Sequence, residues 1–117
     1  WHGFRWGIVT NKHSKYVNKI VNGLNINKRI SCLVTGNMVS EPKPAPDSLI
    51  HAMCLLEEEP NNIIYVGDDE RDIIAGKAAG MRTVAADFGF ILDSAEINTW
   101  NADNIIMQPK ELIEIIN

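Results

Sequence analysis

Short apolar runs that alternate with helical segments constrain the fold of this chain more than any other feature. The runs lie at residues 4–10, 31–36, 62–67 and 81–87, with a shorter one at 103–107. After the first run, the i, i+3, i+4, i+7 spacing of one helix face is occupied by Val17, Ile20, Val21 and Leu24. Further helices are predicted from Asp47, over residues 72–80 and over 109–116, the last with Pro109 at its first position. Alternating strands and helices predict an α/β fold with a parallel sheet.

Composition sets the size and class of the protein. The 117 residues are 45% hydrophobic and 22% charged, which is typical of one globular domain with its own core. The net charge of −4, without a Lys/Arg stripe, argues against a nucleic-acid-binding surface. No apolar run approaches the ~20 residues of a membrane-spanning helix. Cys32 and Cys54 lie in apolar surroundings without metal-ligand spacing, so we expect two reduced core cysteines and a cytoplasmic protein.

Polar side chains gather where three successive predicted strands end. Thr10 and Asn11 follow the first strand, Lys43 lies in the proline-rich loop after the second, and Asp68 and Asp72 follow the third. The carboxyl ends of parallel strands meet at one edge of the sheet, where ligands of such folds bind. Each residue alone has an ordinary structural explanation, such as a helix cap, a solvated loop charge or a complement to the helix dipole. Their joint placement favours a functional site.

Three stretches of the sequence resemble the motifs of a known family. GIVTNK (7–12), EPKPAPDSL (41–49) and YVGDDERDIIAGKAAGM (65–81) are similar to motifs two, three and four of the haloacid dehalogenase superfamily. The similarity is greatest to its phosphoglycolate-phosphatase-like members. It implies a Rossmann-like parallel sheet with flanking helices and a Mg²⁺-dependent phosphomonoester hydrolase. The partner would be a small phosphorylated metabolite, with no nucleic acid and no membrane.

The resemblance also implies a role for each matched residue. Thr10 would hydrogen-bond the transferring phosphoryl group, and Asn11 would add a donor beside it. Lys43 would neutralise the nucleophile and the phosphoryl oxygens, and Asp68 would bind Mg²⁺. Asp72 would hold metal-bound water or orient Lys43, so Thr10, Lys43 and Asp72 are the candidate catalytic residues. These roles agree with the chemistry, because phosphoryl transfer depends on positioned cations and donors, and Mg²⁺ prefers carboxylate and water oxygens.

Two parts of the family pattern are missing from the sequence. There is no DxDGT motif, which supplies the aspartate nucleophile and the general acid/base, and there is no cap domain. Residues 1–117 therefore resemble the C-terminal portion of a phosphatase core domain. Because the chain opens without Met, close to its first strand, we expect further residues before Trp1. Catalysis would pass through an aspartyl phosphate whose nucleophile lies outside this chain, so we expect the chain alone to be inactive.

The sequence is compatible with more than one substrate and more than one class of protein. Phosphoglycolate is the default substrate. A sugar phosphate such as N-acetylmuramic acid 6-phosphate is the second choice, since residues 69–81 and 100–103 also resemble phosphatases of that type. A non-catalytic remnant that serves as a binding module is a third choice. A receiver domain of two-component signalling has a similar set of residues in another order along the chain. Because no phospho-acceptor Asp ends a central strand here, the sequence argues against this class. Asp69 and Glu70 fall outside the matched positions, and we interpret them as charges at the start of a helix.

The resemblance finally predicts a gap in the sheet. In this family the motif-one strand lies between the motif-two and motif-four strands, so the strands at 4–10 and 62–67 would each lose a neighbour. Open edges leave backbone groups unpaired and invite pairing with another chain. The two strands could pair directly, another chain could supply a strand, or a missing half could fill the gap. We favour an intermolecular solution, a homodimer through the unpaired strand edges.

Overall fold

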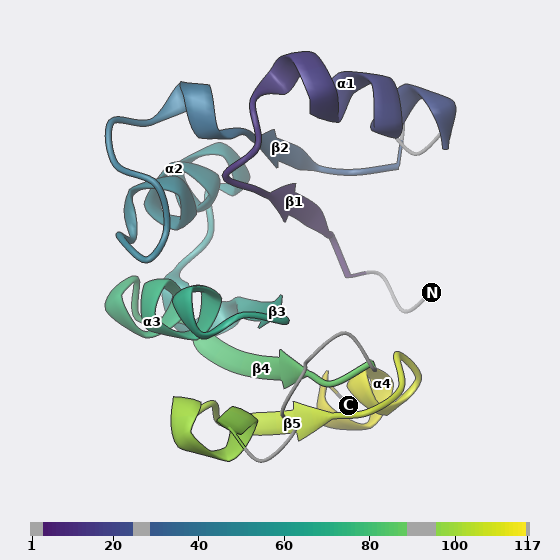
Figure 1. Cartoon of the computed structure of the whole chain (residues 1–117), viewed down its shortest axis with the longest axis vertical. Helices are drawn as coiled ribbons and strands as arrows, with labels where there is room; N and C mark the ends of the chain where they lie inside the picture. Colours follow the sequence, from purple (N-terminus) through teal and green to yellow (C-terminus); the bar gives the residue numbers. More distant parts are fainter. Residues whose placement is uncertain (1–3, 25–28, 89–95, 117) are drawn as a thin grey trace.

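The computed structural model describes residues 4–24, 29–88 and 96–116, and within them the strands form two parallel sheets (Figure 1). In the first sheet, β1 (Gly7–Val9) pairs with β2 (Cys32–Val34). In the second, β4 (Arg82–Ala86) lies between β3 (Ile64–Gly67) and β5 (Asn104–Ile106). Every pair is parallel. The predicted α/β class is confirmed, and each predicted strand is present with shorter ends.

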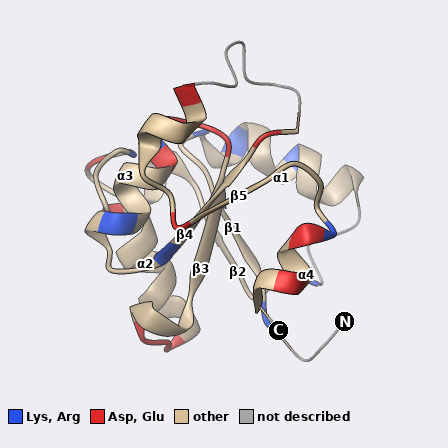
Figure 2. Cartoon of the chain, turned by 90° about the horizontal axis from the view of Figure 1, so that it is seen from below, with Lys and Arg blue, Asp and Glu red and all other residues tan. Residues whose placement is uncertain are grey.

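Helices connect the strands and cover both faces of the sheets. The described residues form α1 (Ser14–Gly23), α2 (Asp47–Leu56), α3 (Glu70–Ala78) and α4 (Glu111–Ile116), and the 3₁₀ turns η1 (Gly36–Met38), η2 (Pro60–Asn62) and η3 (Glu96–Trp100). In Figure 2, α2 and α3 lie on one side of the strands, and α1 and α4 lie on the other. Because α1 follows β1 and α3 follows β3, the first turns of both helices lie at the carboxyl edge of the strands.

The core is built from several apolar clusters. Val84 of β4 and Ile106 of β5 form one cluster, against which α4 packs. Ala85 of β4 and Ile73 of α3 form another. A third cluster, around Leu49 of α2, is contacted by side chains of both β1 and β3. Helix α2 therefore ties the two sheets together by burial of apolar surface, although the sheets share no backbone hydrogen bonds among the described residues.

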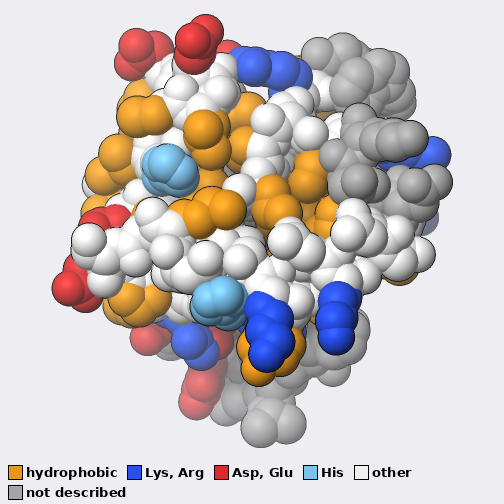
Figure 3. Space-filling model, turned by 90° about the horizontal axis from the view of Figure 1, so that it is seen from above, with side chains coloured by type: hydrophobic (Ala, Val, Ile, Leu, Met, Phe, Trp, Pro, Cys, Tyr) orange, Lys and Arg blue, Asp and Glu red, His pale blue; other side chains and the backbone are white. Residues whose placement is uncertain are grey.

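The apolar stripe predicted for the first helix is only half buried. Val17 and Val21 are buried, but Ile20 and Leu24 are 52% and 65% exposed. Figure 3 shows the side of the molecule on which α1 lies, with hydrophobic side chains at the surface beside Lys and His side chains. Helix α1 therefore buries its apolar stripe at Val17 and Val21 and exposes the rest of it.

The first strand is shorter than predicted, since its ladder with β2 covers only Gly7–Val9. The guanidinium of Arg5 donates to the Leu56 carbonyl at 2.9 Å and to the Glu58 carboxylate at 3.2 Å. Both acceptors belong to the end of α2 and the loop after it. The Arg5 side chain is thus fixed to the end of α2, while the Trp6 carbonyl accepts from the Ser31 N–H at 2.7 Å, directly before the paired residues Gly7 and Cys32.

The structure bears on two further expectations, the start of the last helix and the burial of the cysteines. Helix α4 begins at Glu111, two residues after Pro109, which belongs to a turn, so the prediction of Pro109 at its first position is wrong. Both thiols are free, as expected, but only Cys32 is buried, and Cys54 is exposed because it lies on the outer face of α2. Among the described residues, no helix has the length and apolar character needed to cross a membrane.

β1 and β3 do not pair with each other in the described part of the chain. Direct closure of the predicted gap therefore does not occur. All four residues of β3 are only half-buried. Among the described residues, no strand lies beside the edge of β3 opposite β4. Pairing with a second copy or with a further segment stays a prediction.

Candidate functional site

The side chain of Lys43 is the centre of the site. Lys43 lies in the loop between β2 and α2, and its ammonium is buried where β1 and β3 end, with 8% of the side chain exposed. Nζ donates to Asp72 Oδ1 at 2.7 Å, to the Tyr65 hydroxyl at 2.7 Å and to the Val9 carbonyl oxygen at 3.3 Å. Each proton of the ammonium therefore has an acceptor. The structure brings Lys43 and Asp72 together, as the orienting role predicted for Asp72 requires.

The surroundings favour the charged form of Lys43. Burial by itself lowers the pKa of an ammonium, but the hydrogen bonds to Asp72 and Tyr65 outweigh it and raise the pKa of Lys43 above its usual 10.5. Burial raises the pKa of the Tyr65 phenol above its usual 10.0, against the opposing effect of Lys43. At neutral pH the site therefore holds a fixed positive charge beside a neutral phenol.

Asp72 reaches Lys43 because Gly67 lets α3 approach the end of β3. A Cβ atom at Gly67 would lie 2.6 Å from Asp72 Oδ2, which is too close for any side chain. The start of α3 is held by Asp69, whose carboxylate accepts from the Arg71 backbone N–H at 3.0 Å and forms an ion pair with the Arg71 guanidinium at 3.2 Å. Asp69 thus has the helix-start role expected for it, and the glycine of the motif has a packing role.

The amide of Asn11 holds the loop that carries Lys43. Its Oδ1 accepts from the Lys43 backbone N–H at 3.0 Å, and its Nδ2 donates to the Lys43 carbonyl at 3.2 Å. Gly36 packs on the Asn11 backbone so closely that a Cβ atom there would lie 2.8 Å from the Asn11 carbonyl carbon. Asn11 was predicted as a phosphate donor. In the structure its side chain joins the loop after β1 to the loop after β2, which leaves one Nδ2 proton for another acceptor.

Thr10 is half-buried directly after β1. Its backbone N–H donates to the Val34 carbonyl at 3.0 Å, which extends the pairing of β1 with β2, and its Oγ1 accepts from the Lys12 N–H at 3.2 Å. The N-cap of α1 is His13, so Thr10 is not the helix cap that its sequence position allowed. No described residue accepts the hydroxyl proton of Thr10, which can therefore be donated to a ligand.

Asp68 is the exposed acid of the site. It follows β3 directly, and its carboxylate forms no ion pair with a described residue. No three His, Cys, Asp or Glu side chains within the described ranges form a metal-binding group, and Asp72 is bonded to Lys43. The chain thus offers one carboxylate to a metal. That fits Mg²⁺, which binds through one or two carboxylates when substrate phosphate and water complete its shell.

Sequence reasoning missed Tyr65. It was treated only as an apolar residue of a strand, yet its hydroxyl contacts the central ammonium. Strand parity could have found it, because Tyr65 precedes Gly67 by two residues and so lies on the same strand face, over which Asp72 folds. The Val9 carbonyl is also part of the site, and no sequence signal marks a backbone oxygen.

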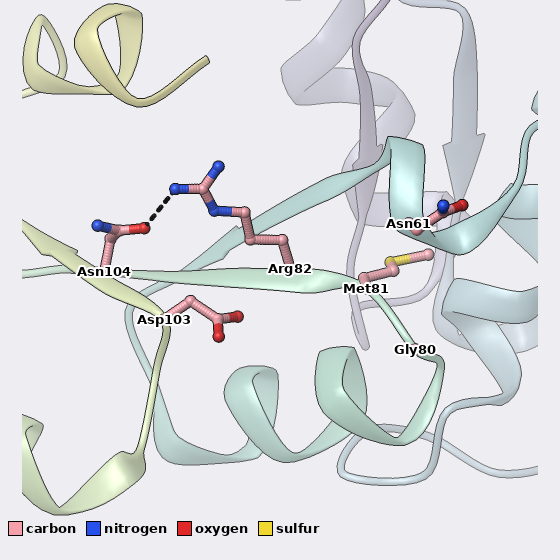
Figure 4. Close-up of a pocket in the computed structure, with 6 residues that line it drawn as sticks. All are labelled: Asn61, Gly80, Met81, Arg82, Asp103 and Asn104. Carbon is pink, nitrogen blue, oxygen red and sulfur yellow. Dashed lines mark hydrogen bonds between the residues drawn. The ribbon is translucent and has the colours of Figure 1, made fainter. Parts of the chain in front are cut away.

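A shallow recess lies at the opposite end of the strands. It is lined by Asn61, Gly80, Met81, Arg82, Asp103 and Asn104 (Figure 4). Three of its polar side chains are bonded within the fold, since Arg82 donates to Asn104 at 2.9 Å and Asp103 accepts from the Thr83 backbone N–H at 2.7 Å. None of the predicted site residues lines it, so the candidate site is at the carboxyl ends of the strands.

Comparison with known proteins identifies the family. The family model of haloacid dehalogenase-like hydrolases matches residues 1–86, which include all the predicted site residues. The chain therefore belongs to the haloacid dehalogenase-like hydrolases, and the resemblance of its three motifs is confirmed.

Relatives and solved structures of this family show how much of such a protein the chain covers. It is 38% identical over 112 residues to N-acetylmuramic acid 6-phosphate phosphatase of Pseudomonas putida, covering 96% of this chain and 50% of the relative. It is 40% identical to phosphoglycolate phosphatase of Xanthomonas campestris pv. campestris, covering 96% and 51%. A crystal structure of a predicted phosphoglycolate phosphatase from Haemophilus somnus matches with a TM-score of 0.88 at 27% identity, covering 98% of this chain and 51% of that one. The chain spans about half the length of the curated relatives it matches.

Proposed function

We propose that this chain supplies the cation, the hydroxyl and the metal ligand of a phosphatase site that hydrolyses a small phosphomonoester. The observation that carries the proposal is the buried Lys43 ammonium, held 2.7 Å from Asp72 where β1 and β3 end. Thr10 and Asp68 follow the same two strands. Phosphoryl transfer is catalysed mainly by positioned charges and donors, which is what this edge of the fold offers.

Each group has one task in this proposal. Thr10 donates its hydroxyl proton to a phosphoryl oxygen. Lys43 binds another phosphoryl oxygen after it gives up the Val9 carbonyl, its longest contact at 3.3 Å, and Asp72 keeps the ammonium in place. Asp68 would hold Mg²⁺, which would withdraw charge from the phosphoryl oxygens.

The attacking group comes from outside the 117 residues. Family resemblance makes it an aspartate that forms an aspartyl phosphate. The unpaired facing edges of β1 and β3 support this part of the proposal, because a further parallel strand placed there would carry its carboxyl end next to Lys43.

Phosphoglycolate is the substrate we propose first, and N-acetylmuramic acid 6-phosphate is the second. Relatives with each name match at 40% and 38% identity, so identity does not separate the two substrates. We propose the cytoplasm as the compartment, because both cysteines are free thiols.

The test is phosphate release from both substrates by the full-length gene product, with Mg²⁺ and with EDTA. We expect turnover that needs Mg²⁺ and is lost in Lys43→Ala. The 117-residue chain alone is assayed with phosphoglycolate and p-nitrophenyl phosphate, and we expect no turnover. Absence of turnover in the full-length product would favour a non-catalytic binding module. Turnover by the chain alone, lost in Lys43→Ala, would overturn the external nucleophile.

The same open edges support a proposal about assembly. Exposed strand edges pair readily with other strands, and β1 and β3 each present one. We propose that two copies of the 117-residue chain pair through these edges. Light scattering after size-exclusion chromatography should give the mass of two chains, and the mass of one chain would contradict the dimer.

A further inference from the structure

We propose that Tyr65 is a positioning residue for Lys43, and that its phenol oxygen and the Asp72 carboxylate together set the direction of the ammonium. The catalytic meaning of this inference rests on the proposed function. Its structural content does not, because it concerns contacts between residues of this chain.

The ammonium of Lys43 is held firmly on two sides and weakly on the third. Nζ lies 2.7 Å from both the Tyr65 hydroxyl and Asp72 Oδ1, whereas the Val9 carbonyl oxygen is 3.3 Å away. Distances near 2.7 Å belong to charge-assisted hydrogen bonds, and longer ones to weaker bonds. The third N–H, directed toward β1, is therefore the one that an incoming anion can take over. Without the phenol, only the contact with Asp72 would hold the ammonium firmly, and the other two N–H groups would be less fixed in direction.

The phenol proton has no good acceptor in the fold. Tyr65 accepts from Lys43, so its own proton must point elsewhere, and the nearest acceptors are the Val9 carbonyl at 3.4 Å and Asp72 Oδ1 at 3.5 Å. Both exceed the usual length of an O–H···O bond, which is about 2.7–2.8 Å. An acidic group that enters between β1 and β3 would satisfy this proton and replace Val9 at the ammonium.

The ring of Tyr65 is fixed well enough to position a neighbour. It packs against the apolar cluster around Leu49 of α2, and Lys43 Nζ lies 5.4 Å from its centroid, beyond the hydroxyl and not over the ring face. A tyrosine side chain has only two torsions, so packing of the ring fixes the oxygen. The change Tyr65→Phe removes that oxygen and keeps the packing of the ring.

The experiment compares Tyr65→Phe with Tyr16→Phe in the full-length protein. Tyr16 is the other tyrosine of the chain, 61% exposed, and it lies beside Lys15 rather than Lys43. The readout is the ¹H–¹⁵N NMR signal of the Lys43 ammonium and its rate of hydrogen exchange. Loss of one hydrogen bond to a charged group should speed this exchange about tenfold in Tyr65→Phe. Tyr16→Phe should leave it unchanged.

An unchanged ammonium signal and exchange rate in Tyr65→Phe would overturn the inference. If far-UV circular dichroism shows that this variant does not fold, the test is made on the unmodified protein by measuring nuclear Overhauser effects. These should connect the Lys43 side chain to the Tyr65 ring, and their absence would overturn the inference. In an active enzyme, Tyr65→Phe should lower kcat more than it changes KM. Faster exchange in an enzyme without phosphatase activity would uphold the positioning of Lys43 and overturn the proposed function.

Discussion

The two sides of the candidate site differ in how far this chain completes them. The lysine side, which we define as Asn11, Lys43, Tyr65 and Asp72, is largely buried, and its polar groups bond to one another. The acid side, which we define as Asp68 and Asp69, is different. Asp68 is exposed without an ion pair among the described residues, and Asp69 is used as a helix cap.

The difference follows from the cost of burial. A buried charge without a partner costs several kcal/mol, so the lysine side must be satisfied by the chain itself, whatever the protein binds. An exposed carboxylate is satisfied by water until a cation arrives. We therefore expect substitutions on the lysine side to change both stability and activity, and substitutions of Asp68 to change activity alone. The predictions below test this division, starting with the largest effect.

The largest effect is expected from Lys43→Met. It leaves the Asp72 carboxylate, 9% exposed, without its cation, and breaking a buried pair in this way costs about 3–5 kcal/mol of unfolding free energy. Urea unfolding measures the loss. In the double variant Lys43→Met, Asp72→Leu most of it should be regained, since an apolar pair of similar volume has no charge to bury. A loss below about 1 kcal/mol in the single variant would show that the pair is not buried in solution.

Asp68→Ala should affect activity and not stability. Loss of one electrostatic stabiliser lowers kcat by about 10²–10³-fold, so we expect at least that loss of phosphatase activity in the full-length enzyme with Mg²⁺. The unfolding free energy should change by less than about 0.5 kcal/mol, as for other exposed positions. Glu70→Ala, the neighbouring exposed acid at the start of α3, is the control and should retain activity. Near-normal turnover in Asp68→Ala would remove Asp68 from the metal site.

Gly67→Ala tests whether close packing places Asp72 on the lysine side. The new methyl group would lie 2.6 Å from Asp72 Oδ2, so α3 or the side chain must shift, at a cost of about 1–3 kcal/mol. Gly23→Ala is the matched control, because nothing lies within 4 Å of a Cβ atom there. Urea unfolding of both variants measures the difference. Equal stability of the two would contradict the tight approach of Asp72 to β3.

Features that follow from local sequence patterns could be predicted, and features that depend on tertiary contacts could not. The five strands follow from local apolar runs, and the family resemblance implied that Asp72 holds metal-bound water or orients Lys43. The structure contains the strands and a contact between Asp72 and Lys43. The sequence did not predict that Ile20 is exposed or that β3 is only half-buried, because burial depends on which elements pack beside a helix or strand. The side-chain task of Asn11 was missed because it arises only when the loops after β1 and β2 meet. Tyr65 was missed because its strand was interpreted only as an apolar run.

The smallest effect is expected at Asp69, on the acid side. Its carboxylate caps α3 by accepting from the Arg71 N–H at 3.0 Å. Replacing an N-cap aspartate by alanine costs about 1 kcal/mol, whereas asparagine caps about as well. Asp69→Ala should therefore lower the unfolding free energy by about that amount, and Asp69→Asn should be nearly neutral. A loss above about 3 kcal/mol in Asp69→Ala would mean that the acid side is as tightly built as the lysine side.

The pH dependence of these variants separates the charge of Asp69 from its capping. The side-chain hydrogen bond from Arg71, and then the backbone hydrogen bond, lower the pKa of Asp69 below its usual 3.8. A carboxyl whose pKa is lower in the folded state stabilises the fold above pH 3.8, and this contribution is lost as the pH falls through the folded pKa. The stability of the unmodified protein should therefore fall more steeply than that of Asp69→Asn between about pH 4 and pH 2. Because the Asp69 side chain is 46% exposed, salt should reduce the difference. Urea unfolding across this range, at low and high salt, measures it. Parallel curves for the two proteins would show that Asp69 acts only as a hydrogen-bond acceptor, and that its charge does not stabilise the fold.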